Sequence, residues 1–237
     1  MRRIVQLARI NPEDTVVEIG PGRGSLTREL SASALRVIAI EIDRDLLPQL
    51  RAEMPANVEI VEGDALTIEF PPRSFHLVGN LPYNIATPLF KRFIEHRSQM
   101  LDVTVMIQKE VADRLIARPG TGEYSPLSIL IQYYAAVTYG FKVPPGAFTP
   151  RPKVDSAVIR LDWKPNVPDA RPFTDFVQLA FGSRRKMLVN NLLHMYGRLG
   201  REEILLRLKK ADVNVDARAE ELSVDQFLRV YNHLENE

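Results

Sequence analysis

Residues 78–83 read Val-Gly-Asn-Leu-Pro-Tyr and end an apolar run that begins at Phe75. This order predicts the carboxyl end of a buried strand, followed at once by an amide, a rigid proline and an aromatic ring. In open α/β sheets, ligands bind outside the carboxyl ends of the strands. The amide oxygen of Asn80 can accept a hydrogen bond from an amino group, and the ring of Tyr83 can stack on a flat heterocycle. The stretch therefore indicates chemistry on the amino nitrogen of a nucleobase.

Strand-like and helix-like segments alternate on both sides of this stretch, over the first 165 residues. Such alternation is typical of a doubly wound sheet. The expected strands are 15–19, 36–40, 58–61, 76–78 and 103–107, and the expected helices are 25–35, 45–53, 88–95 and 110–117. Two late strands, 137–143 and 154–161, are expected to pair around the proline-rich loop between them.

The composition changes at residues 163–168, Trp-Lys-Pro-Asn-Val-Pro, which read as a linker. Beyond it, apolar side chains recur with the helical period, at Phe173, Phe176, Val177, Ala180 and Phe181. We therefore expect an α/β fold with a Rossmann-like catalytic domain over residues 1–165. A small all-α domain is expected over residues 166–237.

Composition excludes several classes of protein. The chain has 45% hydrophobic and 26% charged residues, which is ordinary for a soluble globular protein. It has no cysteine, and its four histidines lack metal-ligand spacing, so we expect no metal site. No apolar run is long enough to span a membrane. Gln6 and Arg9 interrupt the first apolar stretch, which favours an amphipathic helix over a signal peptide and predicts a cytoplasmic protein.

Charge is unevenly distributed although the net charge is only +1. Residues 171–210 carry nine Lys and Arg against three Asp and Glu. A basic stretch of this kind either binds phosphate or solvates a helix face, and charge counting alone leaves both readings open.

A glycine-rich loop, Gly20-Pro21-Gly22-Arg23-Gly24, follows the first strand and precedes a helix. Its spacing differs from the G-x-G-x-x-G of dinucleotide enzymes. Glu41 ends the second strand, where a carboxylate can accept both hydroxyls of a ribose. Asp64 ends the third strand, where it can accept from the amino group of an adenine. Together they predict a pocket for the adenosine of S-adenosylmethionine. A nicotinamide site, a plain tight turn and helix caps are the alternatives for the separate features.

The chain resembles the KsgA/RsmA rRNA adenine N6-dimethyltransferases over nearly its whole length. Family members usually begin with a basic segment that closes over the cofactor. This sequence begins after that segment, and we expect the core site to form without it. The resemblance is carried mainly by residues 17–27, 41–43, 79–83 and 143–156, with further similarity at 183–186 and 219–223.

The resemblance and the strand-end pattern together assign three groups of site residues. The catalytic group is Asn80, Leu81, Pro82, Tyr83 and Phe148. The group that binds S-adenosylmethionine is Glu18, Gly20, Gly22, Gly24, Leu26, Glu41, Ile42, Asp64, Ala65 and Asn80. The RNA-binding group is Arg151, Lys153, Arg184, Arg185 and Lys186, and the resemblance implies that the all-α domain over residues 166–237 contacts RNA.

In the hypothesis that follows, Asn80 Oδ1 and the Leu81 carbonyl accept the two amino hydrogens of the target adenine. Pro82 fixes the Leu81 carbonyl in place, and Tyr83 stacks on the base. The resemblance places Phe148 on the other face of the base. For isolated aromatic residues, burial in the core is the alternative. Transfer requires no metal and no general base, and its coproduct is S-adenosylhomocysteine.

The resemblance implies small-subunit rRNA in a pre-30S ribosomal particle as the partner of a monomeric enzyme. One alternative is an Erm-like 23S rRNA adenine methyltransferase, which Leu81 and the long motif from Phe148 to Ser156 disfavour. A second is a non-catalytic ribosome-assembly or RNA-binding factor, which the intact Asn80-to-Tyr83 motif disfavours. A nicotinamide oxidoreductase is the third, and the glycine spacing argues against it.

Overall fold

The computed structural model describes residues 1–148, 151–168, 171–183 and 186–235. The chain divides into two compact units. One is Met1–Ala112 with Ala135–Lys164, and the other is Asp113–Tyr134 with Pro165–Glu237. The first is an α/β unit and the second is helical.

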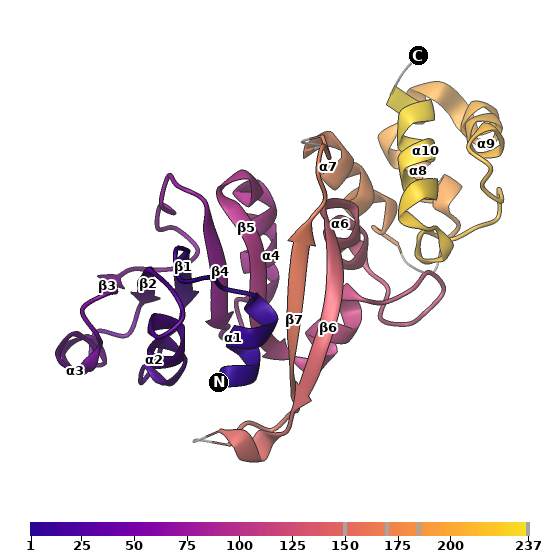
Figure 1. Ribbon diagram of the computed structural model, residues 1–237. Coiled ribbons are helices and arrows are strands. Elements are labelled where there is room, and N and C mark those ends of the chain that lie inside the picture. Colours follow the sequence, from indigo (N-terminus) through magenta and orange to yellow (C-terminus); the bar gives the residue numbers. More distant parts are fainter. Residues whose placement is uncertain (149–150, 169–170, 184–185, 236–237) are drawn as a thin grey trace. The chain divides into compact units, whose positions relative to one another are not determined.

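The α/β unit is built on a seven-stranded sheet with the order β3-β2-β1-β4-β5-β7-β6 (Figure 1). The strands from β3 to β5 are parallel, and β7 is antiparallel to both of its neighbours. This confirms the expected Rossmann-like α/β fold. The bounds are β1 Thr15–Ile19, β2 Arg36–Glu41, β3 Val58–Glu62, β4 Phe75–Asn80, β5 Met100–Gln108, β6 Ala135–Val143 and β7 Ser156–Trp163.

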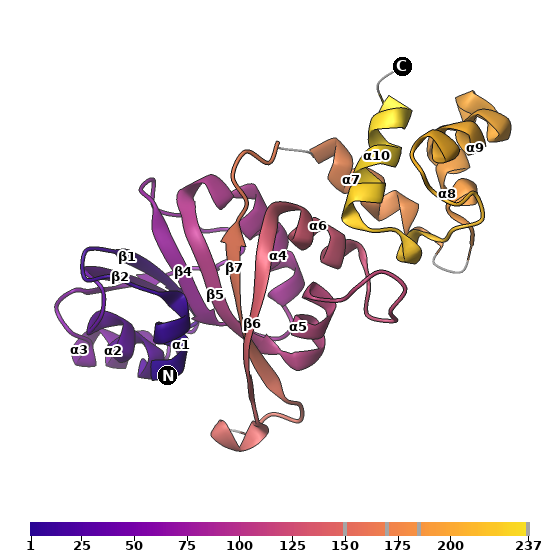
Figure 2. The same ribbon diagram turned by 45° about the vertical axis from the view of Figure 1, so that its right-hand side comes forward.

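The inner parallel strands are buried on both faces, so their sequences read as continuous apolar runs. Helices cover both faces, and α4 lies on the side of the sheet opposite α1 (Figures 1 and 2). The helices that begin in this unit are α1 Arg2–Ala8, α2 Ser25–Ser31, α3 Leu47–Glu53, α4 Ala86–Glu95 and α5 Lys109–Leu115, with 3₁₀ turns η1 Arg97–Gln99 and η2 Pro145–Ala147.

The helical unit has a core of aromatic side chains. Phe173 and Phe176 contact Tyr231, and Phe227 contacts both Phe176 and Phe181. Its elements are α6 Pro126–Tyr134, α7 Arg171–Ala180, α8 Leu188–Met195, η3 Gly197–Leu199, α9 Gly200–Lys210, η4 Ala219–Glu221 and α10 Val224–Glu235. The α6 helix, which precedes β6 in the chain, therefore packs with helices that follow residue 165.

The face of the sheet beneath α1 and α2 has three layers. Because side chains alternate along a strand, His76, Val78 and Asn80 of β4 share this face. Val78 joins the apolar middle layer, which Met106, Val158 and the buried side chains of α1 and α2 complete. His76 lies at the amino edge of β4 and Asn80 at its carboxyl edge. The apolar layer therefore separates a buried charged cluster from the edge where the sequence predicts chemistry.

The charged cluster is centred on Asp102 of β5. His76 Nδ1 lies 2.7 Å from Asp102 Oδ2, and His76 Nε2 lies 3.0 Å from Asp14 Oδ2. Arg160 of β7 donates to the same Asp102 oxygen at 2.9 Å. Burial alone would lower the pKa of His76, but the hydrogen bonds and charges of Asp102 and Asp14 outweigh it and raise that pKa above its usual value. The imidazolium is therefore favoured between two carboxylates.

Arg160 also joins this cluster to α1. Its guanidinium donates to the carbonyls of Leu7 and Ala8 at 3.1 and 2.6 Å, and to Asp162 at 2.9 Å. The last carbonyls of a helix have no partner within the helix, and a cation there also complements the helix dipole. The cluster thus anchors the carboxyl end of α1 to the sheet.

We expect His76→Gln to lower the free energy of unfolding by roughly 1.5–3 kcal/mol at pH 6, the scale of a charged hydrogen bond. A raised folded-state pKa of histidine stabilises the fold below its unfolded pKa, and that contribution is lost as pH rises through the folded pKa. Denaturant unfolding of both proteins at pH 6 and pH 9 should therefore show a smaller difference at pH 9. A difference of equal size at both pH values would contradict the charged cluster.

Candidate functional site

The predicted site residues of the α/β unit gather at the carboxyl edge of the parallel strands, around the junction of β1 and β4. Ile19 pairs with Gly79, so the loop that follows β1 starts beside the end of β4. Gly20 has a φ of +69°, and a Cβ atom there would lie 3.3 Å from the Asn80 carbonyl oxygen. The glycine loop can therefore lie against β4 because Gly20 has no side chain.

Glu41 is buried at the end of β2 and is bonded to this loop. Its Oε2 accepts from the Gly22 N–H at 3.1 Å, and its Oε1 accepts from the N–H groups of Ile42 and Asp43 at 3.0 and 2.9 Å. A carboxylate offers about four acceptor positions. Three are occupied, which leaves Oε2 able to accept one further hydrogen bond. Glu41 can thus hold the turn together and still accept a hydrogen bond from a ribose hydroxyl.

Asp64 follows β3 and begins a turn. Its Oδ1 accepts from the Leu66 N–H at 2.8 Å, a bond that does not use Oδ2. Ala65 beside it is buried, as is Leu26 of α2, whereas Ile42 is 64% exposed. An apolar wall and a carboxylate oxygen suit the edge of a purine.

Glu18 of β1 lies beneath the glycine loop and is only 1% exposed. Within the described residues neither of its carboxylate oxygens has a hydrogen-bond partner. Burial raises the pKa of Glu18 to about 8, opposed by the nearby Thr27 hydroxyl and assisted by the charge of Glu41. A buried, unpaired carboxyl group of this kind is costly unless a cation or a donor approaches it.

These groups fit an adenosine that carries a positive charge. The loop supplies close backbone approach, Glu41 and Asp64 supply acceptor positions, and Glu18 supplies an unpaired acid. Within the described residues no group of three or more histidine, cysteine, aspartate or glutamate side chains is placed to hold a metal ion.

Asn80 and Leu81 present two hydrogen-bond acceptors at the end of β4. The Asn80 side chain is half-buried, and no hydrogen bond joins it to another described residue. The Leu81 N–H donates to the Met106 carbonyl at 3.0 Å, which continues the ladder between β4 and β5. No described residue donates to the Leu81 carbonyl. Both acceptors that the hypothesis requires are therefore free, and Pro82 follows them directly.

Tyr83 is held by a residue of the Phe148-to-Ser156 motif that was not among the predicted site residues. Its hydroxyl lies 2.8 Å from Ser156 Oγ, and Ser156 is fully buried at the start of β7. The bond joins residues 73 positions apart. Only the pairing of β7 with β5 brings Ser156 to the edge of the sheet where Tyr83 lies.

Phe148 lies on the loop between β6 and β7, which carries η2 (Figure 2). It lines a cavity of about 530 Å³ beside α1, together with Met106, Phe141 and Val143. Among the described rings, no contact joins Phe148 to Tyr83. Met106 pairs with Asn80 in the sheet, so the cavity begins one residue from the predicted catalytic amide. Sequence reasoning did not find Met106, because its position depends on the register of β5.

Three of the five predicted RNA-binding residues lie in the described part of the chain. Arg151 and Lys153 are exposed on the loop that carries Phe148, and Lys186 is exposed in the helical unit. Arg184 and Arg185 lie outside the described residues. No helix in the described ranges combines the length and apolar character that crossing a bilayer requires.

Comparison with known proteins finds similarity to ribosomal RNA methyltransferases over nearly the whole chain. The family model for ribosomal RNA adenine dimethylase matches residues 1–236. The ribosomal RNA small subunit methyltransferase A of Alkaliphilus oremlandii is 41% identical over 247 residues, which cover 98% of this chain and 85% of that protein. The protein of the same name from Enterococcus faecalis is 39% identical, covering 99% of this chain and 85% of its own length.

Two solved structures share the fold over both units of the chain. A dimethyladenosine transferase from Plasmodium falciparum has a TM-score of 0.83 at 29% identity, covering 96% of this chain and 92% of that one. The 23S rRNA methyltransferase ErmE has a TM-score of 0.75 at 31% identity, covering 99% and 96%.

We expect Glu41→Ala to weaken S-adenosylmethionine binding about 10- to 100-fold, because a charge-assisted hydrogen bond is lost and the Gly22 loop is released. Titration calorimetry measures the affinity. Glu62→Ala is the matched control, since Glu62 pairs with Glu41 in the sheet but is exposed and bonded to Arg44. If the Glu41 and Glu62 variants bind S-adenosylmethionine with equal affinity, Glu41 is not part of the cofactor site.

Proposed function

Because the chain belongs to the ribosomal RNA adenine dimethylase family, we propose that it methylates N6 of adenines in small-subunit (16S) rRNA. S-adenosylmethionine is the methyl donor and N6,N6-dimethyladenosine is the product. The observation that carries the proposal is the pair of free acceptors, Asn80 Oδ1 and the Leu81 carbonyl, beside the glycine loop. They suit an amino group that carries two hydrogens.

The chemical difficulty is the nucleophile, since the lone pair of an adenine amino group is delocalised into the ring. Asn80 and the Leu81 carbonyl accept the two amino hydrogens and hold the nitrogen pyramidal, with its lone pair directed at the incoming carbon. Pro82 limits backbone motion at this point. Positioning of this kind brings the reacting atoms to about 3–3.5 Å. The methylated nitrogen then loses its proton to water, so no general base is needed.

When bound, S-adenosylmethionine would supply an electrophilic methyl group, with S-adenosylhomocysteine as the coproduct. Gly20, Gly22 and Gly24 would admit the cofactor close to the backbone, Glu41 would accept from its ribose, and Asp64 would accept from its adenine. Leu26, Ile42 and Ala65 would contact the adenosine. Glu18 would supply a buried acid near the cationic part of the cofactor.

Tyr83 stacks on the target base, and its hydroxyl is fixed by Ser156. The base must be unpaired or extruded from its helix to reach Asn80. Phe148 covers the other face of the base once the loop that carries it lies over the site. Arg151 and Lys153 on that loop, with Arg184, Arg185 and Lys186 in the helical unit, neutralise RNA phosphates.

The partner in this proposal is a pre-30S ribosomal particle in the cytoplasm, approached by a monomer. We also propose that the α/β unit, within the expected domain 1–165, performs catalysis, while residues 166–237 contact RNA. The likeness to ErmE favours a second candidate function, adenine methylation in large-subunit rRNA.

One assay separates the two functions. The purified chain is incubated with tritiated S-adenosylmethionine and either small or large ribosomal subunits that lack the modification. We expect label in 16S rRNA, recovered as N6,N6-dimethyladenosine. Label confined to 23S rRNA would establish the second function, and absence of label from both would favour a non-catalytic RNA-binding factor.

We expect Asn80→Ala to reduce the rate of methyl transfer at least about 100-fold while cofactor affinity changes little. The amide orients the nucleophile in the transition state more than it binds the ground state, so the loss falls on kcat. Tyr83→Ala should instead impair both base capture and rate. Single-turnover kinetics and calorimetry measure the two effects. Near wild-type dimethylation by the Asn80 variant would refute the mechanism.

Replacing Arg151 and Lys153 with alanine should weaken binding to small subunits and reduce its salt dependence. Each lost phosphate contact lowers the slope of log affinity against log salt by about 0.7–0.9, so we expect a change of up to about 1.8. The control replaces Arg73 and Lys91, one exposed arginine and one exposed lysine away from the loop. Equal slopes in both double variants would mean that Arg151 and Lys153 contact no phosphate.

A further inference from the structure

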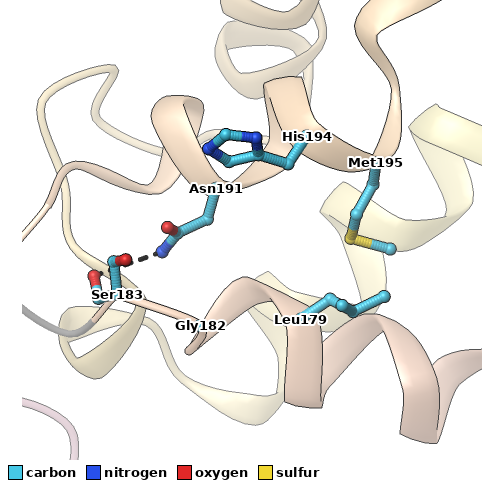
Figure 3. Close-up of a pocket in the computed structure, with 6 residues that line it drawn as sticks. All are labelled: Leu179, Gly182, Ser183, Asn191, His194 and Met195. Carbon is cyan, nitrogen blue, oxygen red and sulfur yellow. Dashed lines mark hydrogen bonds between the residues drawn. The ribbon is translucent and has the colours of Figure 1, made fainter.

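The helical unit contains a pocket of about 450 Å³ that takes no part in the methyl-transfer site described above. Figure 3 shows that two helices and the turn that follows the first of them form its walls. The lining residues are Leu179 of α7, Gly182 and Ser183 of the turn, and Asn191, His194 and Met195 of α8.

Asn191 gives this pocket an oriented hydrogen-bond acceptor. The side chain is only 4% exposed, and its Nδ2 donates to the carbonyls of Ala180 and Ser183 at 2.7 and 3.3 Å. Both amide hydrogens are therefore used to hold the end of α7 against α8. These two bonds do not use Oδ1, the acceptor atom of the amide. A ligand that enters the pocket can satisfy it only with an N–H or O–H donor.

The remaining walls suit a flat ring. His194 lies one turn after Asn191 on the same face of α8, and its imidazole is exposed (Figure 3). Leu179 is 52% exposed although it lies in a concave wall, and Met195 is half-buried. Exposed apolar side chains that line a cavity mark a binding site more often than scattered ones do.

The charges beside the pocket favour a nucleotide. None of the described lining residues is acidic. The N–H of Lys186 donates to the Ser183 carbonyl at 3.0 Å. The exposed side chain of Lys186 is therefore attached beside Ser183, which lines one wall of the pocket. The described lining therefore carries no negative charge and has one cation at its edge, an arrangement that suits a base whose phosphate lies outside the pocket.

We propose that this pocket binds one unpaired base of the ribosomal RNA, other than the adenine that is methylated. The inference rests on the proposed function, which supplies RNA as the partner. The base stacks on His194 between Leu179 and Met195, and one of its N–H groups donates to Asn191 Oδ1. Lys186 binds a neighbouring phosphate. Proteins commonly read RNA by placing an unstacked base on an aromatic or histidine ring and bonding its edge.

The test uses His194→Ala and Leu179→Ser, both at exposed positions where folding tolerates the change. The matched control is Leu206→Ser, because Leu206 of α9 is 47% exposed and lies outside the pocket lining. Filter binding to under-methylated small subunits is measured over a range of salt concentrations. We expect each pocket variant to bind about five- to 100-fold more weakly, the scale of one lost base stack. The salt slope should stay unchanged, since no phosphate contact is removed.

Ultraviolet cross-linking of the complex identifies the chemistry of the occupant. The expected result is a nucleotide attached to the peptide that contains His194. Pocket variants that bind as tightly as Leu206→Ser would overturn the inference and leave the proposed function standing. Weaker binding with a ribosomal protein cross-linked at His194 would also overturn it. A wild-type chain that neither binds nor methylates small subunits would overturn the inference and the proposed function together.

Discussion

β1 and β4 approach each other so closely at their carboxyl ends that side chains are excluded from two positions. A Cβ atom on Gly79 would lie 2.6 Å from the Ile19 carbonyl oxygen, well inside van der Waals contact. Gly20 crosses the end of β4 with a positive φ, and a Cβ atom there would press on the Asn80 carbonyl. The loop that is expected to admit the cofactor and the amide that is expected to orient the nucleophile are thus adjacent because both glycines are present.

A charged cluster at the amino edge of the same sheet face supports the junction of β1 and β4. Asp102, His76 and Arg160 form a buried charged layer that holds α1 over the sheet, and the apolar layer of Val78, Met106 and Val158 lies between it and the site. Buried ion pairs contribute little net stability when their desolvation is counted, but removing one partner is costly. The cluster therefore fixes where α1 lies more than it adds to overall stability. Residues of α1 and Met106 both line the cavity that holds Phe148. The position of α1 therefore affects the carboxyl edge of the sheet, where the reaction is expected.

Much of this arrangement could be predicted from the sequence, because its signals are local. Alternating strands and helices indicated the sheet, and a glycine loop, Glu41, Asp64 and Asn80 each lie at the end of a strand or just after it. Contacts between distant strands could not be predicted in the same way. Ser156 meets Tyr83, and Arg160 meets Asp102, only once the antiparallel register of β7 is known. Nothing in the local pattern showed that Glu41 bonds the Gly22 N–H, or that α6 packs with the helices after residue 165.

The central claim is that the end of β4 holds the amino group of an unpaired adenine in front of the methyl donor. A crystal structure of the chain with S-adenosylhomocysteine and an adenosine-containing oligonucleotide tests it most directly. The account predicts that the target ring stacks on Tyr83, with N6 within hydrogen-bond distance of Asn80 Oδ1 and the Leu81 carbonyl. The sulfur should face N6 from the glycine-loop side. An adenine bound elsewhere, or one whose N6 is turned away from both acceptors, would contradict the account.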